Sequence, residues 1–307
     1  MRVGKMPGLL LVLALCFALF TGGCGSSKEK VVYLTHNDKA VFGSLIKEAF
    51  DRIARSHNQP VEYKDAGNRA ETQIAQIEEA VKDGVKIIVL LAVDEEKLVP
   101  AVEKAMDAGV HVIAVNRHLR SSRVLGVFPD EYGAGKLQAE YMERNLPMGA
   151  RVVYLQGTAS QLSAQERWAG FRERCLERRK DVHLMDRKDG NYSREEGHRI
   201  MAQWLERYPH VDAVICGNDE MALGAYEALK EAGRSRGCMV SGIDATEAAL
   251  ASIGANGMVQ TVKQDAAHQA AGAYQLVDEV QRGVARKGNI ISPFTSITKD
   301  NLAQFRK

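Results

Sequence analysis

The chain has 307 residues, of which 45% are hydrophobic and 26% charged, and this balance excludes a disordered, collagenous or coiled-coil protein. The first 23 residues contain Arg2 and Lys5 but no acid, so the remaining 284 carry 39 basic and 39 acidic side chains and no net charge. A neutral chain argues against nucleic acid or an anionic membrane surface as the main partner. At this length we expect two lobes with separate cores.

The N-terminus has the pattern of a secretion signal. Arg2 and Lys5 precede an unbroken apolar run of 12 residues, Leu9–Phe20. This run is shorter than the roughly 20 residues that a membrane-spanning helix needs. We therefore expect residues 1–23 to be a signal peptide and the protein to be exported, to the periplasm or the outer face of the cell membrane.

The residues after the apolar run resemble a bacterial lipobox. Small residues lead directly to Cys24, although Thr21 stands where an aliphatic residue is usual. We expect Cys24 to carry a lipid anchor and residues 24–30 to form a flexible tether. Ordinary cleavage without a lipid is the alternative.

From Val31 onward, short β-branched or apolar runs alternate with stretches of helical periodicity. The runs predict strands at Val31–Leu34, Val61–Tyr63, Ile87–Leu91, Val112–Val115, Val124–Phe128, Val152–Leu155, Val182–Met185, Ala213–Cys216, Met239–Ile243 and Val259–Val262. The stretches predict helices at Phe42–Ile53, Thr72–Val81, Leu98–Ala108, Leu137–Leu146, Arg167–Leu176, Arg199–Tyr208, Ala222–Ala232 and Ala266–Val280. This alternation is typical of an α/β protein with mainly parallel sheets flanked by helices.

Polar side chains follow almost every predicted strand. Ligands bind at this edge of open parallel sheets, because helix N-termini and loop backbone converge there. Some of these residues have a structural explanation: Asp130, Asp219 and Asp265 are expected as helix N-caps, and Ser163 to Glu166 matches a capping box.

No catalytic, cofactor or metal motif is present in the sequence. The segment Gly133 to Lys136 looks like a phosphate loop, but Asp130 and Leu137 stand where such a loop needs Gly and Ser or Thr. The eight histidines have no metal-ligand spacing, and Glu95-Glu96 is more typical of a solvated helix start than of an acid–base pair. We therefore expect no enzyme activity, no cofactor and no metal.

Three cysteines remain in the predicted mature chain beyond Cys24: Cys175, Cys216 and Cys238. Their spacing suits neither a zinc site nor a full disulfide framework, so buried free thiols are expected. A Cys216–Cys238 bridge is the alternative in an oxidising compartment.

Three segments resemble the ribose/galactose class of periplasmic sugar-binding proteins, which have the type I solute-binding fold. They are Gly217-Asn-Asp-Glu-Met-Ala-Leu-Gly-Ala225, Glu166-Arg-Trp-Ala-Gly-Phe171 and Ser241-Gly-Ile-Asp244. The similarity runs in order from Val31 to about Val280. The same superfamily contains the effector domains of lactose-repressor-type regulators, but a repressor needs a helix-turn-helix where this chain has a predicted signal peptide.

The resemblance implies a set of ligand-binding residues. Two arginines look like guanidinium groups that clamp adjacent hydroxyls, planar polar groups complete the hydrogen bonds, and two aromatics look like the pair that sandwiches the sugar ring. With two further candidates from the same loops, the predicted site comprises Lys39, Phe42, Asn68, Asn116, Arg117, Arg167, Tyr192, Asn218, Asp244 and Gln264.

The departures from the family pattern bear on the ligand. Lys39 replaces a hydrogen-bonding Asn of ribose binders, Val41 replaces an aromatic, and Asn116 stands where they have an Asp. The galactose branch does carry Asn there, but its His and Asp ahead of the clamp arginine are Gln161 and Ser163 here. Ribose is therefore doubtful, and a hexose, a cyclic polyol such as an inositol, or a sugar acid pairing with Lys39 remain open.

The resemblance also implies an organisation and a mechanism. The N-terminal lobe is expected at 30–129 plus 265–293 and the other at 130–264 plus 294–307, with crossings near Asp130, near Gln264 and between Ser292 and Thr295. A monomer would close its lobes around a sugar or polyol and deliver it to the membrane permease of an ABC importer. A sugar-sensing module for a chemoreceptor or sensor kinase is the alternative.

Overall fold

The computed structural model describes residues 28–284 and 286–305, together with Met1. The predicted cleavage site and Cys24 lie outside the described residues. Within the described part of the chain, no helix is both long and apolar enough to cross a bilayer.

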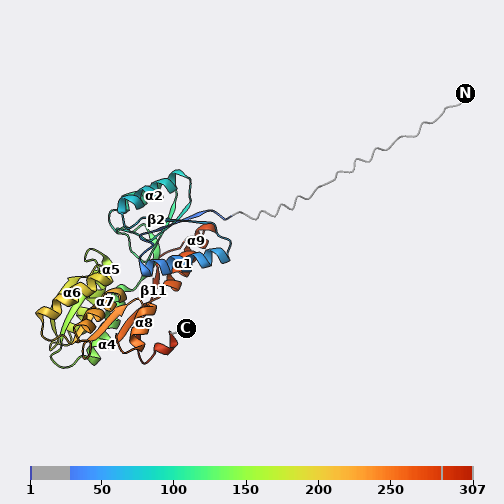
Figure 1. The fold of residues 1–307 in the computed structure, drawn as a ribbon. Helices are drawn as coiled ribbons and strands as arrows, with labels where there is room; N and C mark the ends of the chain where they lie inside the picture. The colour runs from blue at the N-terminus through green and yellow to red at the C-terminus, as the bar shows by residue number, and fades with distance from the viewer. Residues whose placement is uncertain (2–27, 285, 306–307) are drawn as a thin grey trace.

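Two six-stranded sheets form the framework (Figure 1). The first contains β1 (Val31–Thr35), β2 (Val61–Asp65), β3 (Ile87–Leu90), β4 (His111–Val115), β5 (Leu125–Pro129) and β11 (Ile290–Ser292). The second contains β6 (Arg151–Gln156), β7 (His183–Asp189), β8 (Ala213–Cys216), β9 (Met239–Ile243), β10 (Gln260–Gln264) and β12 (Phe294–Thr298). Every pairing is parallel except that of β10 with β12. The predicted α/β class with mainly parallel sheets is confirmed.

Both sheets have the same strand order. The first runs β2-β1-β3-β4-β5-β11 and the second β7-β6-β8-β9-β10-β12. In each sheet, the second strand in the chain lies on one side of the first strand, β1 or β6, and the later strands are added on its other side. The order of strand addition therefore reverses at the first strand. Such a switch point leaves a crevice outside the carboxyl ends of the strands, where ligands bind.

Helices cover both faces of each sheet. On the first sheet, α1 (Val41–Ser56) and α9 (Ala266–Gln281) pack on one face, and α2 (Ala70–Lys82) and α3 (Val99–Asp107) on the other. On the second, α6 (Arg194–Arg207), α7 (Asp219–Glu231) and α8 (Glu247–Gly254) cover one face. The other face carries α4 (Glu131–Asn145), α5 (Leu162–Phe171) and a π-helical turn, Arg172–Leu176. We call the two assemblies the N-terminal and C-terminal lobes; Figure 1 shows them as separate bodies.

The chain passes between the sheets three times: from β5 to α4, from β10 to α9, and from β11 to β12. These passages lie at residues 129–131, 264–266 and 292–294. The residue boundaries of the lobes stay a prediction. A final short 3-10 helix, Leu302–Gln304, lies against α8.

The structure contains four elements that the sequence patterns did not predict. They are α8, β11, β12 and the 3-10 helix Leu302–Gln304, which have eight, three, five and three residues. Elements this short contain too few repeats of a hydrophobic pattern to be recognised from the sequence. In addition, β11 and β12 form by hydrogen bonding to β5 and β10, which would otherwise be the edge strands of their sheets. The predicted helix at Leu137–Leu146 begins earlier, at Glu131, because the Asp130 side chain accepts a hydrogen bond from the backbone N–H of Gly133.

Glycines allow α4 and α5 to pack at very short range. A Cβ atom on Gly135 of α4 would lie 2.0 Å from the carbonyl oxygen of Arg167, and one on Gly170 of α5 would lie 2.2 Å from that of Tyr132. No side chain fits at such distances. The two glycines therefore fix the backbone position of Arg167 against α4.

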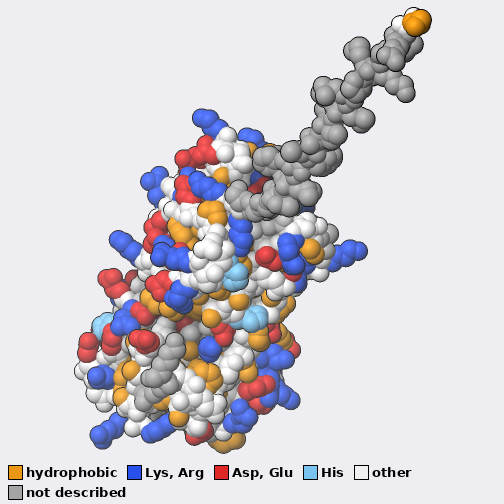
Figure 2. All heavy atoms as spheres, turned by 90° about the vertical axis from the view of Figure 1, so that its right-hand side faces the viewer, with side chains coloured by type: hydrophobic (Ala, Val, Ile, Leu, Met, Phe, Trp, Pro, Cys, Tyr) orange, Lys and Arg blue, Asp and Glu red, His pale blue; other side chains and the backbone are white. Residues whose placement is uncertain are grey.

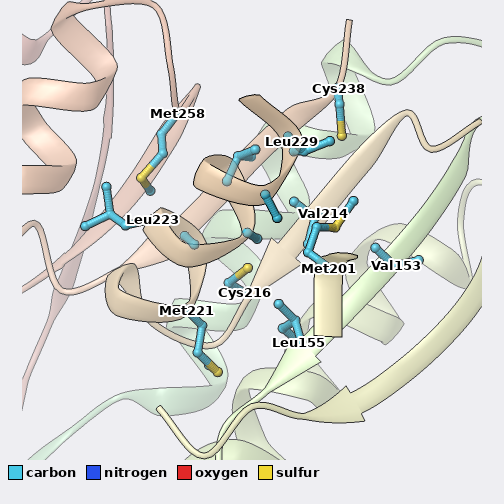
Figure 3. Close-up of a cluster of buried hydrophobic side chains, with 14 of the residues drawn as sticks. Val153, Leu155, Met201, Val214, Cys216, Met221, Leu223, Leu229, Cys238 and Met258 are labelled. Atoms are coloured by element: carbon cyan, nitrogen blue, oxygen red, sulfur yellow. The ribbon is translucent and has the colours of Figure 1, made fainter. Parts of the chain in front are cut away.

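The three cysteines within the described residues are free and buried. Cys216 and Cys238 belong to the hydrophobic cluster under α7, which Figure 3 shows, and Cys175 lies between the second sheet and α4. The expectation of buried free thiols is confirmed, and the alternative of a Cys216–Cys238 bridge is wrong.

These thiols should be unreactive in the folded protein. Burial raises the pKa of Cys175 to about 11 and that of Cys238 to about 12, so the reactive thiolate is scarce at neutral pH. We expect the thiols of a chain that begins at Gly25 not to react rapidly with a thiol-specific disulfide reagent while the protein is folded. After denaturation, the chain should react with three equivalents of the reagent. Rapid modification of the native protein would contradict this buried arrangement.

Candidate functional site

A cleft of about 390 Å³ lies between the two lobes, at the carboxyl ends of the strands. This volume is in the range of sites that enclose a small molecule. All ten predicted site residues line it, five from each lobe: Lys39, Phe42, Asn68, Asn116 and Arg117 face Arg167, Tyr192, Asn218, Asp244 and Gln264 across it. The structure thus brings together residues that are up to 225 positions apart in the sequence.

Backbone carbonyls position Arg117 on the N-terminal side. Its Nη1 atom donates to the carbonyl oxygens of Ala92, at 3.0 Å, and Val93, at 3.3 Å, so one edge of the guanidinium is held behind the cleft. Burial lowers the pKa of Arg117, while Tyr192 and Glu95 act in the opposite direction. The preceding residue, Asn116, donates from Nδ2 to Gln269 at 3.1 Å. The remaining guanidinium donors of Arg117 have no acceptor in the described part of the chain, so they can meet hydroxyl oxygens.

Arg167 is the most constrained side chain of the site. It is 4% exposed, and its Nε donates to Oε2 of Glu131 at 2.5 Å. Its Nη1 donates to the carbonyl oxygen of Gly217 at 2.6 Å, and its guanidinium lies 5.9 Å from the centre of the Phe294 ring. Burial alone would lower the pKa of Arg167, but the neighbouring anionic groups, Glu131 foremost, raise it above its ordinary value. The guanidinium is therefore charged and aimed before any ligand arrives.

Glu131 is the main site residue that the sequence patterns missed. It lines the cleft, is 4% exposed and is the first residue of α4, directly after the chain passes between the lobes. A carboxylate is favoured at that end of a helix. Its place beside Asp130, at the carboxyl end of a predicted strand, was the signal that could have identified it.

Tyr192 occupies its place because Gly157 has no side chain. A Cβ atom on Gly157 would lie 1.9 Å from the Tyr192 ring. The Tyr192 hydroxyl and the Ser163 hydroxyl are 2.9 Å apart and hydrogen-bonded. The predicted capping box at Ser163 is therefore wrong, because α5 begins at Leu162, Ser163 lies within the helix and its hydroxyl is engaged with Tyr192.

Asn218 both caps a helix and faces the cleft. Its Oδ1 accepts from the backbone N–H of Met221 at 3.0 Å, and its Nδ2 donates to the carbonyl oxygen of Tyr192 at 3.3 Å. The predicted cap at the next residue, Asp219, is wrong: Asp219 is fully buried and accepts instead from Thr261 of β10 and from Thr246, which precedes α8. Asn218 is therefore rigid before binding.

Strained backbone is concentrated at the site. Asn68, Asn116, Asn191, Tyr192 and Asp244 all line the cleft and have positive φ angles of 61°, 67°, 50°, 58° and 128°. Such conformations are rare for residues with a Cβ atom and cost free energy. At Asp244 the strain coincides with a carboxyl whose pKa is raised well above its ordinary value by burial, although Arg167 opposes this shift.

Two buried polar atoms at the cleft have no partner among the described residues. They are Nε2 of Gln264 and Nδ1 of His36, and both residues line the cleft. Buried polar atoms are normally hydrogen-bonded, so an unpaired pair at one site marks a place where a polar ligand or water completes the bonding.

Acid should destabilise the protein through His36. Burial, helped by Arg117, lowers the pKa of this imidazole from 6.5 to about 2, so the folded state holds His36 neutral while the unfolded state gains a proton below pH 6.5. Stability is therefore lost as the pH falls from about 6.5 towards 2. Between pH 7 and pH 5 this group should remove roughly 1–2 kcal/mol from the free energy of unfolding. Chemical denaturation of wild type and His36→Gln at both pH values checks this, and an equal acid sensitivity of the two would contradict it.

Lys39 lies at the mouth of the cleft and is exposed. Its backbone N–H donates to the Asn37 side chain at 2.9 Å. The neighbouring Asp38 pairs with Lys47 at 2.6 Å. The ammonium group has no partner among residues 28–284 and 286–305, so it can approach a ligand.

The described residues hold no group of His, Cys, Asp or Glu side chains suited to a metal ion.

On the face that Figure 2 shows, acidic and basic side chains are interspersed rather than gathered into a patch of one sign.

Comparison with known proteins identifies the family. A family model described as a periplasmic binding protein domain matches residues 31–284. The chain is 29% identical over 279 residues to a xylitol-binding protein of Mycolicibacterium smegmatis, covering 90% of this chain and 79% of that one. It is 28% identical to a ribose import binding protein of Bacillus subtilis over 272 residues, 88% and 87% of the two chains. A Caulobacter myo-inositol binding protein, solved with myo-inositol, superposes with a TM-score of 0.85 at 27% identity, covering 91% and 96%.

The chain therefore belongs to the periplasmic binding protein family. It is a solute-binding protein with the type I fold, of the class that serves ABC importers, and the predicted resemblance is confirmed. The sensory alternative is not favoured, because the similar proteins named above are described by binding or import and none by signalling.

Proposed function

We propose that the protein captures a neutral monosaccharide or cyclic polyol in the cleft, by closure of the two lobes, and presents it to the permease of an ABC importer. The observation that carries this proposal is the meeting of five predicted residues from each lobe around one cavity of about 390 Å³. A ligand that bridges both walls stabilises the closed arrangement by its differential affinity for it.

The roles of the ten residues follow from their chemistry. Arg117 and Arg167 donate to vicinal hydroxyl oxygens, and Asp244 accepts from two hydroxyls. Phe42 and Tyr192 cover the apolar faces of the ring. Asn68, Asn116, Asn218 and Gln264 complete the hydrogen bonds, and Lys39 meets an oxygen at the entrance. Glu131 joins this set by orienting Arg167.

We further propose that the mature protein begins at a lipid-bearing Cys24, works as a monomer and has no enzymatic activity, cofactor or metal.

The names of similar proteins support a polyol or pentose as the ligand, since they include xylitol, ribose and myo-inositol. A hexose is a further candidate within the proposed class, and a sugar acid pairing with Lys39 is the competing ligand.

A thermal-shift scan tests the ligand class. The chain from Gly25 is unfolded, refolded without ligand and mixed with xylitol, D-ribose, myo-inositol, D-galactose or D-glucuronate. A ligand at about 100 times its Kd adds about 2.7 kcal/mol to stability, so a selective hit is easily seen. A response to D-glucuronate alone would replace the neutral ligand with a sugar acid, and silence throughout would reject sugar and polyol capture.

A further inference from the structure

Glu95 makes a contact that the two lobes share. It follows β3 in the N-terminal lobe, and its Oε2 accepts a hydrogen bond, at 3.2 Å, from the backbone N–H of Leu162. Leu162 is the first residue of α5, which belongs to the C-terminal lobe. Glu95 is 6% exposed, so the expectation that it is a solvated helix start is wrong.

The N-terminal lobe holds Glu95 in this position. The Asp94 side chain accepts from the backbone N–H groups of Glu96, at 3.0 Å, and Lys97, at 2.9 Å, which closes the turn after β3. The carbonyl oxygen of Glu95 accepts from the N–H of Arg120 at 2.9 Å. The carboxylate therefore projects from a fixed turn of the N-terminal lobe towards the start of α5.

The C-terminal lobe offers a matching partner. The first N–H groups of a helix have no partner within it and carry partial positive charge. Gln161, which precedes α5, forms no side-chain cap with the described residues. The carboxylate of the other lobe thus supplies the acceptor that the start of α5 lacks, and only while the lobes are together.

The helix reached by Glu95 carries part of the site. Ser163 and Arg167 lie on α5 and line the cleft, whereas Glu95 does not line it. The charge of Glu95 also acts on Arg117 of its own lobe, where it opposes the lowering of the Arg117 pKa by burial. Glu95 is therefore placed to influence binding without touching the ligand.

We infer that Glu95 is a closure residue: its carboxylate docks the start of α5 onto the N-terminal lobe and stabilises the ligand-binding arrangement. This inference rests on the proposed function for its effect on affinity, but not for its effect on lobe separation. Losing a hydrogen bond to a charged group reduces the closed population, and the apparent affinity falls by the same factor for every ligand, about tenfold.

Distances between spin labels test closure directly. Cysteines replace Glu78 on α2 and Arg207 on α6, which are 57% and 69% exposed at the side chain, and the buried native thiols stay unlabelled. Without ligand, Glu95→Ala should shift the distance distribution towards larger separations than in wild type. Glu96→Ala is the matched control, because Glu96 is exposed and, within the part of the chain that the structure describes, its side chain pairs only with Arg120 of its own lobe. Equal distributions for wild type, Glu95→Ala and Glu96→Ala would overturn the inference.

Affinity measurements supply the second readout, with myo-inositol and D-ribose as probes. Glu95→Ala should raise both Kd values by one common factor, Glu95→Gln by less because its amide oxygen still accepts, and Glu96→Ala should leave them unchanged. A change confined to one probe would mark Glu95 as a ligand contact and overturn its assignment to closure. If neither probe binds wild type, the proposed function fails for these ligands, while the label distances still decide the role of Glu95.

Discussion

Replacing Arg167 with alanine should abolish detectable ligand binding and also destabilise the fold by about 3–5 kcal/mol. The substitution removes the guanidinium that faces the cleft, and it leaves the Glu131 carboxylate 4% exposed without its cation. An unpaired buried charge is far more costly than the loss of one hydrogen bond. Calorimetric titration and chemical denaturation measure the two effects.

A double variant separates these effects. Adding Glu131→Gln to Arg167→Ala removes the stranded charge, so most of the lost stability should return while binding stays absent. If Arg167→Ala binds the ligand as tightly as wild type, Arg167 is not part of the site. If the double variant is no more stable than the single one, the ion pair is not the source of the destabilisation.

Replacing Asp244 with glycine should change binding and stability in opposite directions. The affinity should fall by about 100-fold, because the hydroxyl groups of the ligand lose the carboxyl group that accepts their hydrogen bonds. The melting temperature should rise, because glycine adopts a φ of 128° without strain and the cost of burying the carboxyl disappears. Strain of this kind at a binding site is offset by the rest of the fold.

Asn58→Gly is the matched control for Asp244→Gly. Asn58 follows α1, has a φ of 52° and does not line the cleft. The control variant should keep the wild-type affinity with a small gain in stability. A lower melting temperature for Asp244→Gly, or an unchanged affinity, would show that Asp244 serves the fold and not the ligand.

The order of strands and helices was readable from the sequence because each βα unit has its own local pattern. All ten predicted strands correspond to strands of the two sheets, within about three residues at each end except for the longer β7. The buried run Ile87–Leu90 is apolar throughout because both faces of its sheet are covered by helices. Short elements such as β11 were missed because a neighbouring strand, and not their own sequence, creates them.

The sequence by itself determined which lobe edges carry polar groups, since residues that follow parallel strands must gather at one end of a sheet. Only the tertiary structure decided how those groups are used. The ion pair of Arg167 with Glu131, the contact of Glu95 with α5 and the engagement of Ser163 by Tyr192 each join residues at least 29 positions apart. Local periodicity holds no information about such pairs, because their partners meet only when the lobes and helices pack together.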